Sequence, residues 1–132
     1  FPGSGGANDL ASHAKKILII TRHEKRRFPE HCDYITSPGY IDGPEGRAKA
    51  GLPMPYPDIV VITDLTVMSI DKAAGRLRVD KLMPGVSIAQ MRENTLFEPL
   101  VAADVVTVAP PDSHELRILR EEVDPNGYVI GR

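Results

Sequence analysis

Residues 38–57 place the strongest constraint on what this chain can fold into, because nine of these twenty positions are glycine or proline. Proline lacks a backbone N–H and glycine weakens regular structure, so we expect neither a helix nor a central strand over this segment. A loop of this length inside a compact domain is usually functional or mobile. A surface loop without a role is an equally good interpretation of the same composition.

The segment before this loop reads as a short helix followed by a strand. A glycine-rich stretch at 3–6 runs into Asn8 and Asp9, which are good helix N-cap residues. The apolar, β-branched run at 17–20 then predicts a buried strand. A turn, a helix and a strand in this order resemble the later part of a strand–turn–helix–strand unit, so we expect the leading strand to come from elsewhere.

After the loop, the pattern indicates an antiparallel hairpin, two helices and a further strand. Residues 58–70 predict one long strand or two strands with a kink near Asp64, and 77–82 alternate as their antiparallel partner. Ser87 and Gln90 form a capping-box pattern for a helix over 84–95. The buried face of that helix is expected to consist of Ile88, Met91 and Thr95. A further strand is expected over 104–109. The last expected helix covers 110–123, begins at Asp112 or Ser113, and buries Leu116, Leu119 and Val123.

Strands that alternate with helices indicate the α/β class, and 132 residues are read as a single domain, 1–132. The net charge of −2 argues against general binding to nucleic acid or to a membrane surface. No apolar run approaches the roughly 20 residues of a membrane-spanning helix. The single cysteine, Cys32, cannot form an internal disulfide, so a reducing, cytoplasmic setting is expected.

The sequence GSGGAND at 3–9 is the strongest local signal for a binding site. Glycines let backbone amides approach a ligand closely, and a following helix N-terminus adds a positive dipole. Such a turn can hold a phosphate, a carboxylate or a developing oxyanion. Its glycine spacing fits neither the dinucleotide-binding fingerprint nor a P-loop. A tight turn without any ligand remains the alternative.

A basic cluster, RHEKRR at 22–27, follows the first expected strand. Arg26 and Arg27 could contact the phosphates of a nucleotide-like group at the carboxyl edge of the sheet. Charge runs are more often solvated and salt-bridged, with Glu24 as the natural partner in this cluster. Asp64 could likewise be a site carboxylate, but a capping role at a strand end is the preferred interpretation.

The remaining reactive side chains give no pattern for a metal or nucleophile site. The four histidines, His13, His23, His31 and His114, lack metal-ligand spacing with a third ligand nearby, so no metal is expected. Cys32 has no paired base or helix start beside it, so it is interpreted as a filler residue rather than a nucleophile.

Taken in order, seven stretches resemble the C-terminal half of the β subunit of family I coenzyme A transferases, of the glutaconate and 3-oxoacid type. The resemblance covers essentially all 132 residues, and its most specific parts are the glycine-rich turn and the PGV helix with its following ENT. The stretches are GSGGANDLAS, KKILIIT, HEKRRF, YITSPGY, VVITDLTVMSID, LMPGVSIAQMRENT and ELRILREEVDPNGYVIG.

The resemblance implies an open α/β fold, a mixed sheet with flanking helices, and an active site formed with an α subunit. It implies ping-pong transfer of coenzyme A between carboxylic acids, through a glutamate that becomes a glutamyl-CoA thioester. The backbone amides of Gly5 and Gly6 would form the oxyanion hole. Coenzyme A is then a substrate as its thioester, with no bound cofactor. The residues expected to contact substrate or coenzyme A are Ser4, Ala7, Asn8, Arg26 and Arg27.

One departure from the family pattern concerns the nucleophile. The catalytic glutamate of the family lies in a Glu-Asn-Gly-type motif upstream of the glycine turn, and Glu93 matches a different, non-catalytic part. We therefore expect this chain to be a truncation or one piece of a split subunit, inactive alone. Its expected partners are the N-terminal half of the β subunit and the α subunit, with an acyl-CoA and a carboxylic acid as substrates.

Two other functions fit the same residues. An acyl-CoA hydrolase or ring-opening enzyme on this scaffold would use the same oxyanion hole with water as the nucleophile. A non-catalytic binding or assembly module would explain the absent nucleophile and an unpaired strand edge. Such a module would bind coenzyme A or a partner without restoring turnover.

Overall fold

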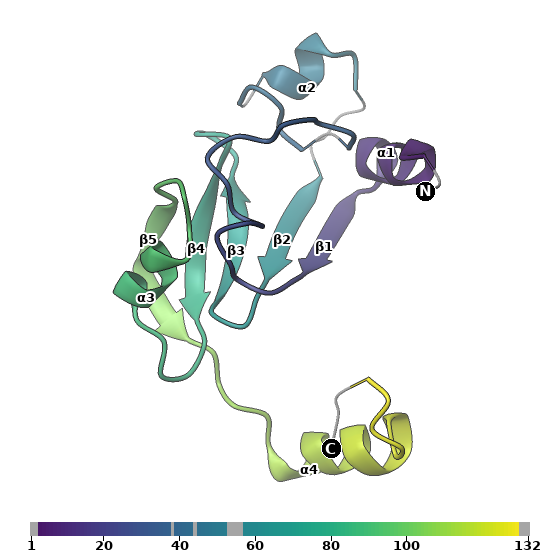
Figure 1. Cartoon of the computed structure of the whole chain (residues 1–132), viewed down its shortest axis with the longest axis vertical. Helices are drawn as coiled ribbons and strands as arrows, with labels where there is room; N and C mark the ends of the chain where they lie inside the picture. The colour runs from purple at the N-terminus through teal and green to yellow at the C-terminus, as the bar shows by residue number, and fades with distance from the viewer. Residues whose placement is uncertain (1–2, 38, 44, 53–56, 130–132) are drawn as a thin grey trace.

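The computed structural model describes residues 3–37, 39–43, 45–52 and 57–129, and these form a five-stranded mixed sheet (Figure 1). The strand order along the sheet follows the chain, β1-β2-β3-β4-β5. The pairs β1–β2 and β4–β5 are parallel, whereas β2–β3 and β3–β4 are antiparallel. This confirms the α/β class with an open mixed sheet. The strands are β1 (Lys16–Ile20), β2 (Asp58–Ile62), β3 (Thr66–Asp71), β4 (Arg76–Leu82) and β5 (Leu100–Thr107).

Helices flank the sheet at several points along the chain. They are α1 (Gly5–His13), α2 (Gly46–Lys49), α3 (Ile88–Glu93) and α4 (Ser113–Arg117), which continues as a π-helical segment, η1 (Ile118–Val123). None of the helices in the described ranges has both the length and the apolar character needed to cross a membrane.

The predicted kink near Asp64 is the turn between β2 and β3. Thr63 forms this turn, because its hydroxyl oxygen accepts hydrogen bonds from the backbone N–H groups of Leu65 (3.1 Å) and Thr66 (2.8 Å). The next turn contains Gly75 with φ at 63°, in the left-handed region that glycine adopts without a Cβ penalty. The predicted antiparallel arrangement of 58–70 and 77–82 is therefore confirmed.

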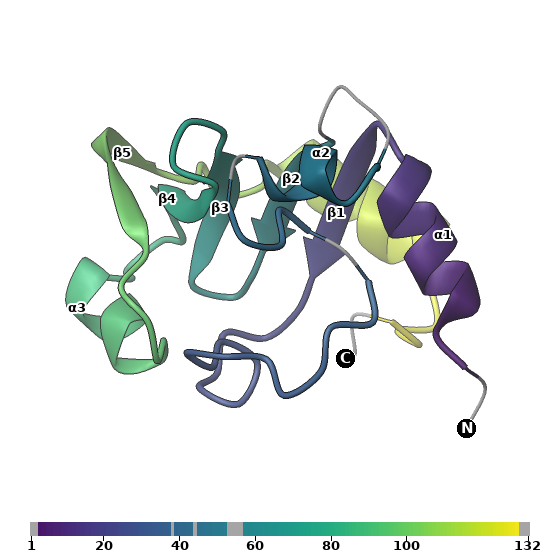
Figure 2. The ribbon, with the colours of Figure 1, turned by 90° about the horizontal axis from the view of Figure 1, so that it is seen from above.

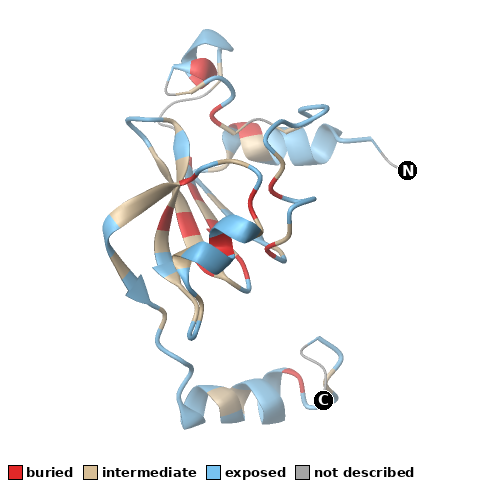
Figure 3. Ribbon diagram, turned by 60° about the vertical axis from the view of Figure 1, so that its left-hand side comes forward, coloured by how far each residue is buried: buried red, intermediate tan, exposed pale blue. Residues whose placement is uncertain are grey.

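The core lies on one face of the central strands (Figure 3). Ile59 and Val61 of β2 alternate inward with Met68 of β3 and Val79 of β4. Helix α3 covers them with Met91, which is fully buried. Ser87 caps this helix by accepting a 3.1 Å hydrogen bond from the Gln90 backbone N–H, in agreement with the sequence pattern.

The expectation that 17–20 form a buried strand is wrong. Strand β1 lies at the edge of the sheet beside β2, and only Ile17 packs against the core. The side chains of Leu18 and Ile20 are 60% and 79% exposed. A continuous apolar run is typical of a strand covered on both faces, but no described element covers this face.

The predicted inward face of the last helix is also wrong. Asp112 and Glu115 form a complete capping box, so the start of the helix agrees with the sequence. However, α4 and η1 stand away from the sheet at the end of an extended segment (Figure 1). Val123 is 69% exposed, and Leu116 and Leu119 are not buried. Helical periodicity identifies an apolar face without determining what packs on it. The preceding strand, β5, begins four residues earlier than predicted.

The expectation of no helix within 38–57 is wrong for the single turn α2. Gly46 begins this turn next to the backbone of Tyr40, whose carbonyl oxygen would clash with any Cβ at position 46. Glycine here does not break the helix; it allows the helix backbone to approach the Tyr40 backbone closely. Pro38, Pro44 and residues 53–56 of the predicted loop lie outside the described residues.

Candidate functional site

The glycine-rich stretch forms the first turn of helix α1, and this corrects the prediction that Asn8 or Asp9 would be the N-cap. Ser4 occupies the N-cap position without a side-chain capping bond, and its carbonyl oxygen accepts the first helical hydrogen bond from the Asn8 N–H at 2.9 Å. Asn8 lies inside the helix, where its Oδ1 accepts from the Ser12 hydroxyl at 3.2 Å. Two good N-cap residues compete in this stretch, and the earlier one begins the helix.

Gly5 and Gly6 are the first two residues of α1, so their amides lie at the positive end of the helix. The first N–H groups of an α-helix have no acceptor within the helix, and the helix dipole places partial positive charge at the same end. Neither glycine has left-handed backbone, and an added Cβ at either would meet nothing within 4 Å. The packing of the described residues therefore does not require glycine at these positions.

The basic cluster at 22–27 is divided between the interior and the surface. His23 is buried, stacks on the Phe28 ring with 4.3 Å between ring centroids, and donates its backbone N–H to the Asp64 carboxylate at 2.6 Å. Asp64 therefore holds the loop after β1 beside the end of β2. Burial lowers the pKa of His23 below its ordinary value, and the nearby Asp64 charge opposes this only in part.

Arg26 and Arg27 turn toward Glu24 on the surface. Glu24 Oε1 accepts from Arg27 Nε at 2.6 Å and from Arg26 Nε at 2.9 Å, and Arg27 also donates to the Thr21 hydroxyl at 3.0 Å. The hydrogen bond from Arg27 is the main reason that the pKa of Glu24 is lowered. Glu24 is thus the salt-bridge partner of both arginines, as predicted, and both guanidinium groups retain donors that face solvent.

The structure does not bring the two predicted parts of the site together within this chain. Both ribbon views place the start of α1 away from the loop that carries 22–28 (Figures 1 and 2). Among the described residues, no hydrogen bond or ion pair joins Ser4, Gly5, Gly6 or Ala7 to Arg26 or Arg27. Glu93 ends helix α3 and is exposed.

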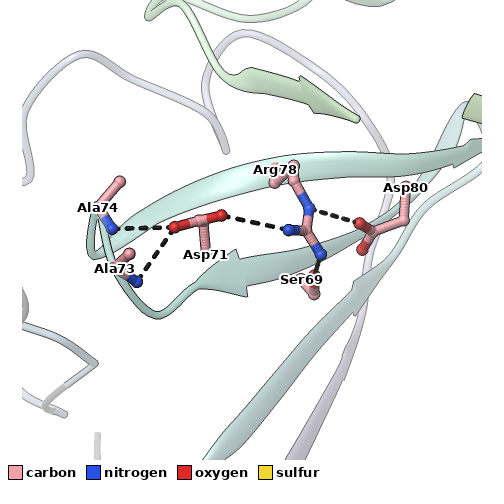
Figure 4. A network of polar contacts seen from close by, with 6 residues as sticks. All are labelled: Ser69, Asp71, Ala73, Ala74, Arg78 and Asp80. Carbon is pink, nitrogen blue, oxygen red and sulfur yellow. Dashed lines mark hydrogen bonds and ion pairs between the residues drawn. The ribbon is translucent and has the colours of Figure 1, made fainter. Parts of the chain in front are cut away.

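A polar network on the β3–β4 hairpin was not predicted from the sequence (Figure 4). Asp71 accepts the backbone N–H groups of Ala74 at 2.9 Å and Ala73 at 3.1 Å, which lower the pKa of its carboxyl together with Arg78. Arg78 in turn donates to Asp71 at 3.2 Å and to Asp80 at 2.8 Å. The spacing of Asp71, Arg78 and Asp80 in an alternating hairpin could have indicated that these groups share one face.

Two open grooves, of about 430 and 560 Å³, border this network. In the first groove Lys72 contacts Asp58 at 2.7 Å, and this bond raises the pKa of Lys72 and lowers that of Asp58. Arg78, which lines both grooves, already contacts two carboxylates. These cations are neutralised within the chain, so the grooves offer little net charge to an anionic ligand. In the part of the chain that the structure describes, no three acidic, histidine or cysteine side chains gather as a metal site.

The chain is similar in sequence to coenzyme A transferases. The family model described as "Coenzyme A transferase" matches residues 1–94. The chain is 40% identical over 130 residues to the glutaconate CoA-transferase subunit designated B of Acidaminococcus fermentans, covering 98% of this chain and 48% of that protein. It is 38% identical over 120 residues to the corresponding 3-oxoadipate CoA-transferase subunit of Pseudomonas knackmussii, covering 91% of this chain and 46% of that protein.

The chain is also similar to a solved transferase structure and to a hydrolase subunit. The crystal structure of glutaconate coenzyme A-transferase from A. fermentans superposes with a TM-score of 0.90 at 39% identity, over 100% of this chain and 50% of that chain. The cholesterol ring-cleaving hydrolase IpdB subunit of Rhodococcus jostii is 32% identical over 127 residues, covering 95% of this chain and 48% of that protein. The chain thus spans about half the length of the curated relatives that it matches.

Proposed function

The chain belongs to the coenzyme A transferase family, and from this premise we propose that it is part of an enzyme that moves coenzyme A between carboxylic acids. The observation that carries the proposal is the match to the A. fermentans glutaconate CoA-transferase subunit, which extends over 98% of the chain in sequence. In our proposal this chain contributes the oxyanion-binding start of α1, and a glutamate from outside this chain is the nucleophile.

The proposed reaction begins when the glutamate carboxylate attacks the thioester carbonyl carbon of an acyl-CoA. The tetrahedral adduct carries a negative oxygen, and it expels coenzyme A as a thiolate to leave an acyl-glutamyl anhydride. The thiolate then attacks the glutamyl carbonyl, which releases the carboxylic acid and leaves the glutamyl-CoA thioester. The acceptor acid reverses these steps, so one set of fixed amide donors serves every tetrahedral adduct.

The start of α1 supports the role of Gly5 and Gly6 as those donors. Their amides have no acceptor in the helix, the dipole favours negative charge there, and both glycines leave open space where a Cβ would stand. Ser4 and Ala7 flank the same turn. The Nδ2 group of Asn8 is a further donor for substrate, since its Oδ1 accepts from Ser12.

The same position offers a sharp test in the assembled enzyme. Proline at position 5 removes one amide N–H and also disfavours the present backbone of Ser4 (φ −86°, ψ 1°), whereas alanine there keeps the N–H and adds only a methyl group. We expect Gly5→Pro to lower kcat by roughly 10²- to 10³-fold, the usual effect of losing one oxyanion donor, and Gly5→Ala to lower it much less. Equal kcat values for the two variants would refute the amide role.

Exposed apolar surface supports the proposed protein partners, the N-terminal half of a β subunit and an α subunit. Leu18 and Ile20 on β1 and Val123 on η1 are 60%, 79% and 69% exposed. The outer edge of β1 also presents backbone groups that no described strand pairs. Exposed apolar side chains beside an open strand edge are typical of a surface that another segment covers.

Arg26 and Arg27 are proposed to contact the phosphates of coenzyme A. Each keeps N–H donors beyond those used by Glu24 and Thr21, and their side chains are 73% and 44% exposed. The double variant Arg26→Ala, Arg27→Ala in the assembled enzyme should raise the KM for acyl-CoA with little change in kcat. An unchanged KM would remove these residues from the site.

The similarity to the R. jostii hydrolase subunit favours a second candidate, hydrolysis or ring opening of an acyl-CoA by water at the same amides. Products separate the two reactions. Transfer yields a new acyl-CoA only when an acceptor acid is present, and it releases no net free thiol. Hydrolysis of the thioester releases coenzyme A without an acceptor acid, and ring opening converts the acyl-CoA to a hydrated acyl-CoA without an acceptor acid and without free thiol. Thiol titration beside chromatography of the acyl-CoA pool therefore decides between them.

A further inference from the structure

Arg47 is a buried cation in the Gly/Pro-rich segment, and it binds the C-terminal end of helix α1. Its side chain on α2 belongs to a residue only 1% exposed. One terminal nitrogen donates to the Ser12 carbonyl oxygen at 2.8 Å, and the other donates to the carbonyl oxygens of Gly39 at 3.1 Å and Ala11 at 3.4 Å. A single guanidinium group therefore joins α1, α2 and the loop between β1 and α2.

The physical chemistry of a helix end explains this placement. The last carbonyl groups of an α-helix lack partners within the helix, and the dipole concentrates negative charge there, so a cation is favoured. Arginine presents several donors in a rigid plane and can satisfy carbonyls from two segments at once. The Nε group of Arg47 is buried and has no hydrogen-bond partner among the described residues, so this contact rests on the terminal nitrogens.

Little else in the described structure holds α1. Ser12 is its only buried residue, and Leu10 is 72% exposed. Figures 1 and 3 show α1 beside the end of the sheet that carries α2, rather than packed across a sheet face. The contacts of Arg47 with Ala11 and Ser12 are thus a principal attachment of this helix within the chain.

We propose that Arg47 is a positioning residue that holds the amides of Gly5 and Gly6 at the reacting carbonyl, an inference that rests on the proposed function. The nine residues of α1 span about 13 Å at a rise of about 1.5 Å per residue. If a helix of that length is held only at its C-terminal end, a tilt of about 5° about that end displaces its N-terminus by about 1 Å. A displacement of about 1 Å can cost about 10²-fold in rate, because the donors must meet the developing oxyanion.

The test compares three variants in the assembled enzyme. Arg47→Met removes the donors and keeps the side-chain volume, Arg47→Lys keeps a cation with fewer donors, and Lys49→Met is the matched control. Lys49 lies on the same helical turn, is exposed, and forms an ion pair with Glu45 at 3.1 Å. Rates are divided by the number of active sites that form a borohydride-reducible thioester, so that unfolded enzyme does not lower the apparent kcat.

We expect Arg47→Met to lower kcat per active site by about 10- to 100-fold with the KM for acyl-CoA unchanged, Arg47→Lys to recover part of that loss, and Lys49→Met to match the wild type. Hydrogen exchange should show faster exchange of the α1 amides in Arg47→Met. Should Arg47→Met fail to fold, Arg47→Lys carries both readouts.

Two outcomes overturn the proposal, and they are distinguishable from each other. Wild-type kcat per active site, or wild-type exchange of the α1 amides, in both Arg47 variants refutes the role of Arg47. A wild-type assembly that binds acyl-CoA and transfers nothing refutes the proposed function instead, and the catalytic role of Arg47 falls with it. In that second case the exchange rates still report whether Arg47 holds α1.

Discussion

His23 Nε2 lies 2.9 Å from the hydroxyl oxygen of Thr95, and this contact joins the loop after β1 to the end of helix α3. Thr95 donates its own hydroxyl hydrogen to the Met91 carbonyl oxygen at 2.9 Å, so the network assigns the proton to Nε2 of His23. Nδ1 lies 3.0 Å from the hydroxyl oxygen of Thr63, which also donates to the Thr66 carbonyl oxygen at 3.1 Å. Burial lowers the pKa of His23 and so favours the neutral imidazole.

The first prediction concerns pH. Because the folded pKa of His23 is lower than the unfolded value of about 6.5, the unfolded chain binds more protons between the two values. The stabilisation from neutral His23 is therefore fully present above about pH 6.5 and is lost as the pH falls toward the folded pKa. Urea unfolding at pH 7.5 and 5.5 should show a loss that is absent in His23→Gln. The same loss in both proteins would contradict the assignment.

The second prediction concerns Thr95. Valine has the same shape but no hydroxyl, so Thr95→Val leaves the buried His23 Nε2–H without an acceptor and should lower the free energy of unfolding by about 1–3 kcal/mol. Serine keeps the hydroxyl, so Thr95→Ser should cost less. Urea unfolding followed by circular dichroism measures both, and a valine variant as stable as the serine variant would show that the contact is dispensable.

The third prediction concerns Gly46, where a Cβ would clash with the Tyr40 carbonyl oxygen. Gly46→Ala should force the backbone of the segment apart and destabilise the chain by about 1–3 kcal/mol, in the range of overpacking. Gly39 lies in the same segment and has open space around it, so Gly39→Ala is the matched control. Comparable thermal midpoints for the two variants would argue against the close approach at Gly46.

Local chemistry made part of the fold predictable. The hairpin of β3 and β4, the Ser87 cap and the burial of Met91 all follow from patterns within a few residues, where propensity and side-chain hydrogen bonds decide the outcome. Asp64 is interpreted from the sequence as a cap at its own strand end, whereas its carboxylate accepts the His23 backbone N–H from the loop after β1. The competing caps Ser4 and Asn8 show the limit of this reasoning, since two good N-cap residues four positions apart do not determine which one begins the helix.

The rest depends on tertiary neighbours that periodicity does not report. Leu18 and Ile20 read as buried because their run is apolar, and Val123 because its spacing is helical, yet no described element covers them. Arg47 gave no signal, because one cation in a glycine-rich loop is indistinguishable from a solvated residue until its carbonyl partners are known. The oxyanion and coenzyme A contacts came from local chemistry together with the family resemblance, and they stay predictions.

The fourth prediction concerns the exposed face of β1. Ile20 is 79% exposed, so Ile20→Asp should leave the fold of this chain intact while it blocks assembly with the proposed partner half, since a carboxylate would be buried in an apolar interface. Ile35→Asp, at a 60% exposed position in a loop, is the control. Co-purification with the partner half should fall for Ile20→Asp alone. Equal recovery of both variants would place the interface elsewhere.

The decisive experiment for the proposed transferase role is mass spectrometry of the assembled enzyme after treatment with acyl-CoA and then borohydride. We expect a reduced glutamyl thioester that requires acyl-CoA, lies on a glutamate outside this chain, and forms far more slowly in Gly5→Pro than in Gly5→Ala. A reduced residue at Glu93 would contradict a nucleophile from outside this chain, transfer with no reducible glutamate would contradict the thioester mechanism, and equal rates in Gly5→Pro and Gly5→Ala would contradict the role of this chain as the source of the oxyanion donors.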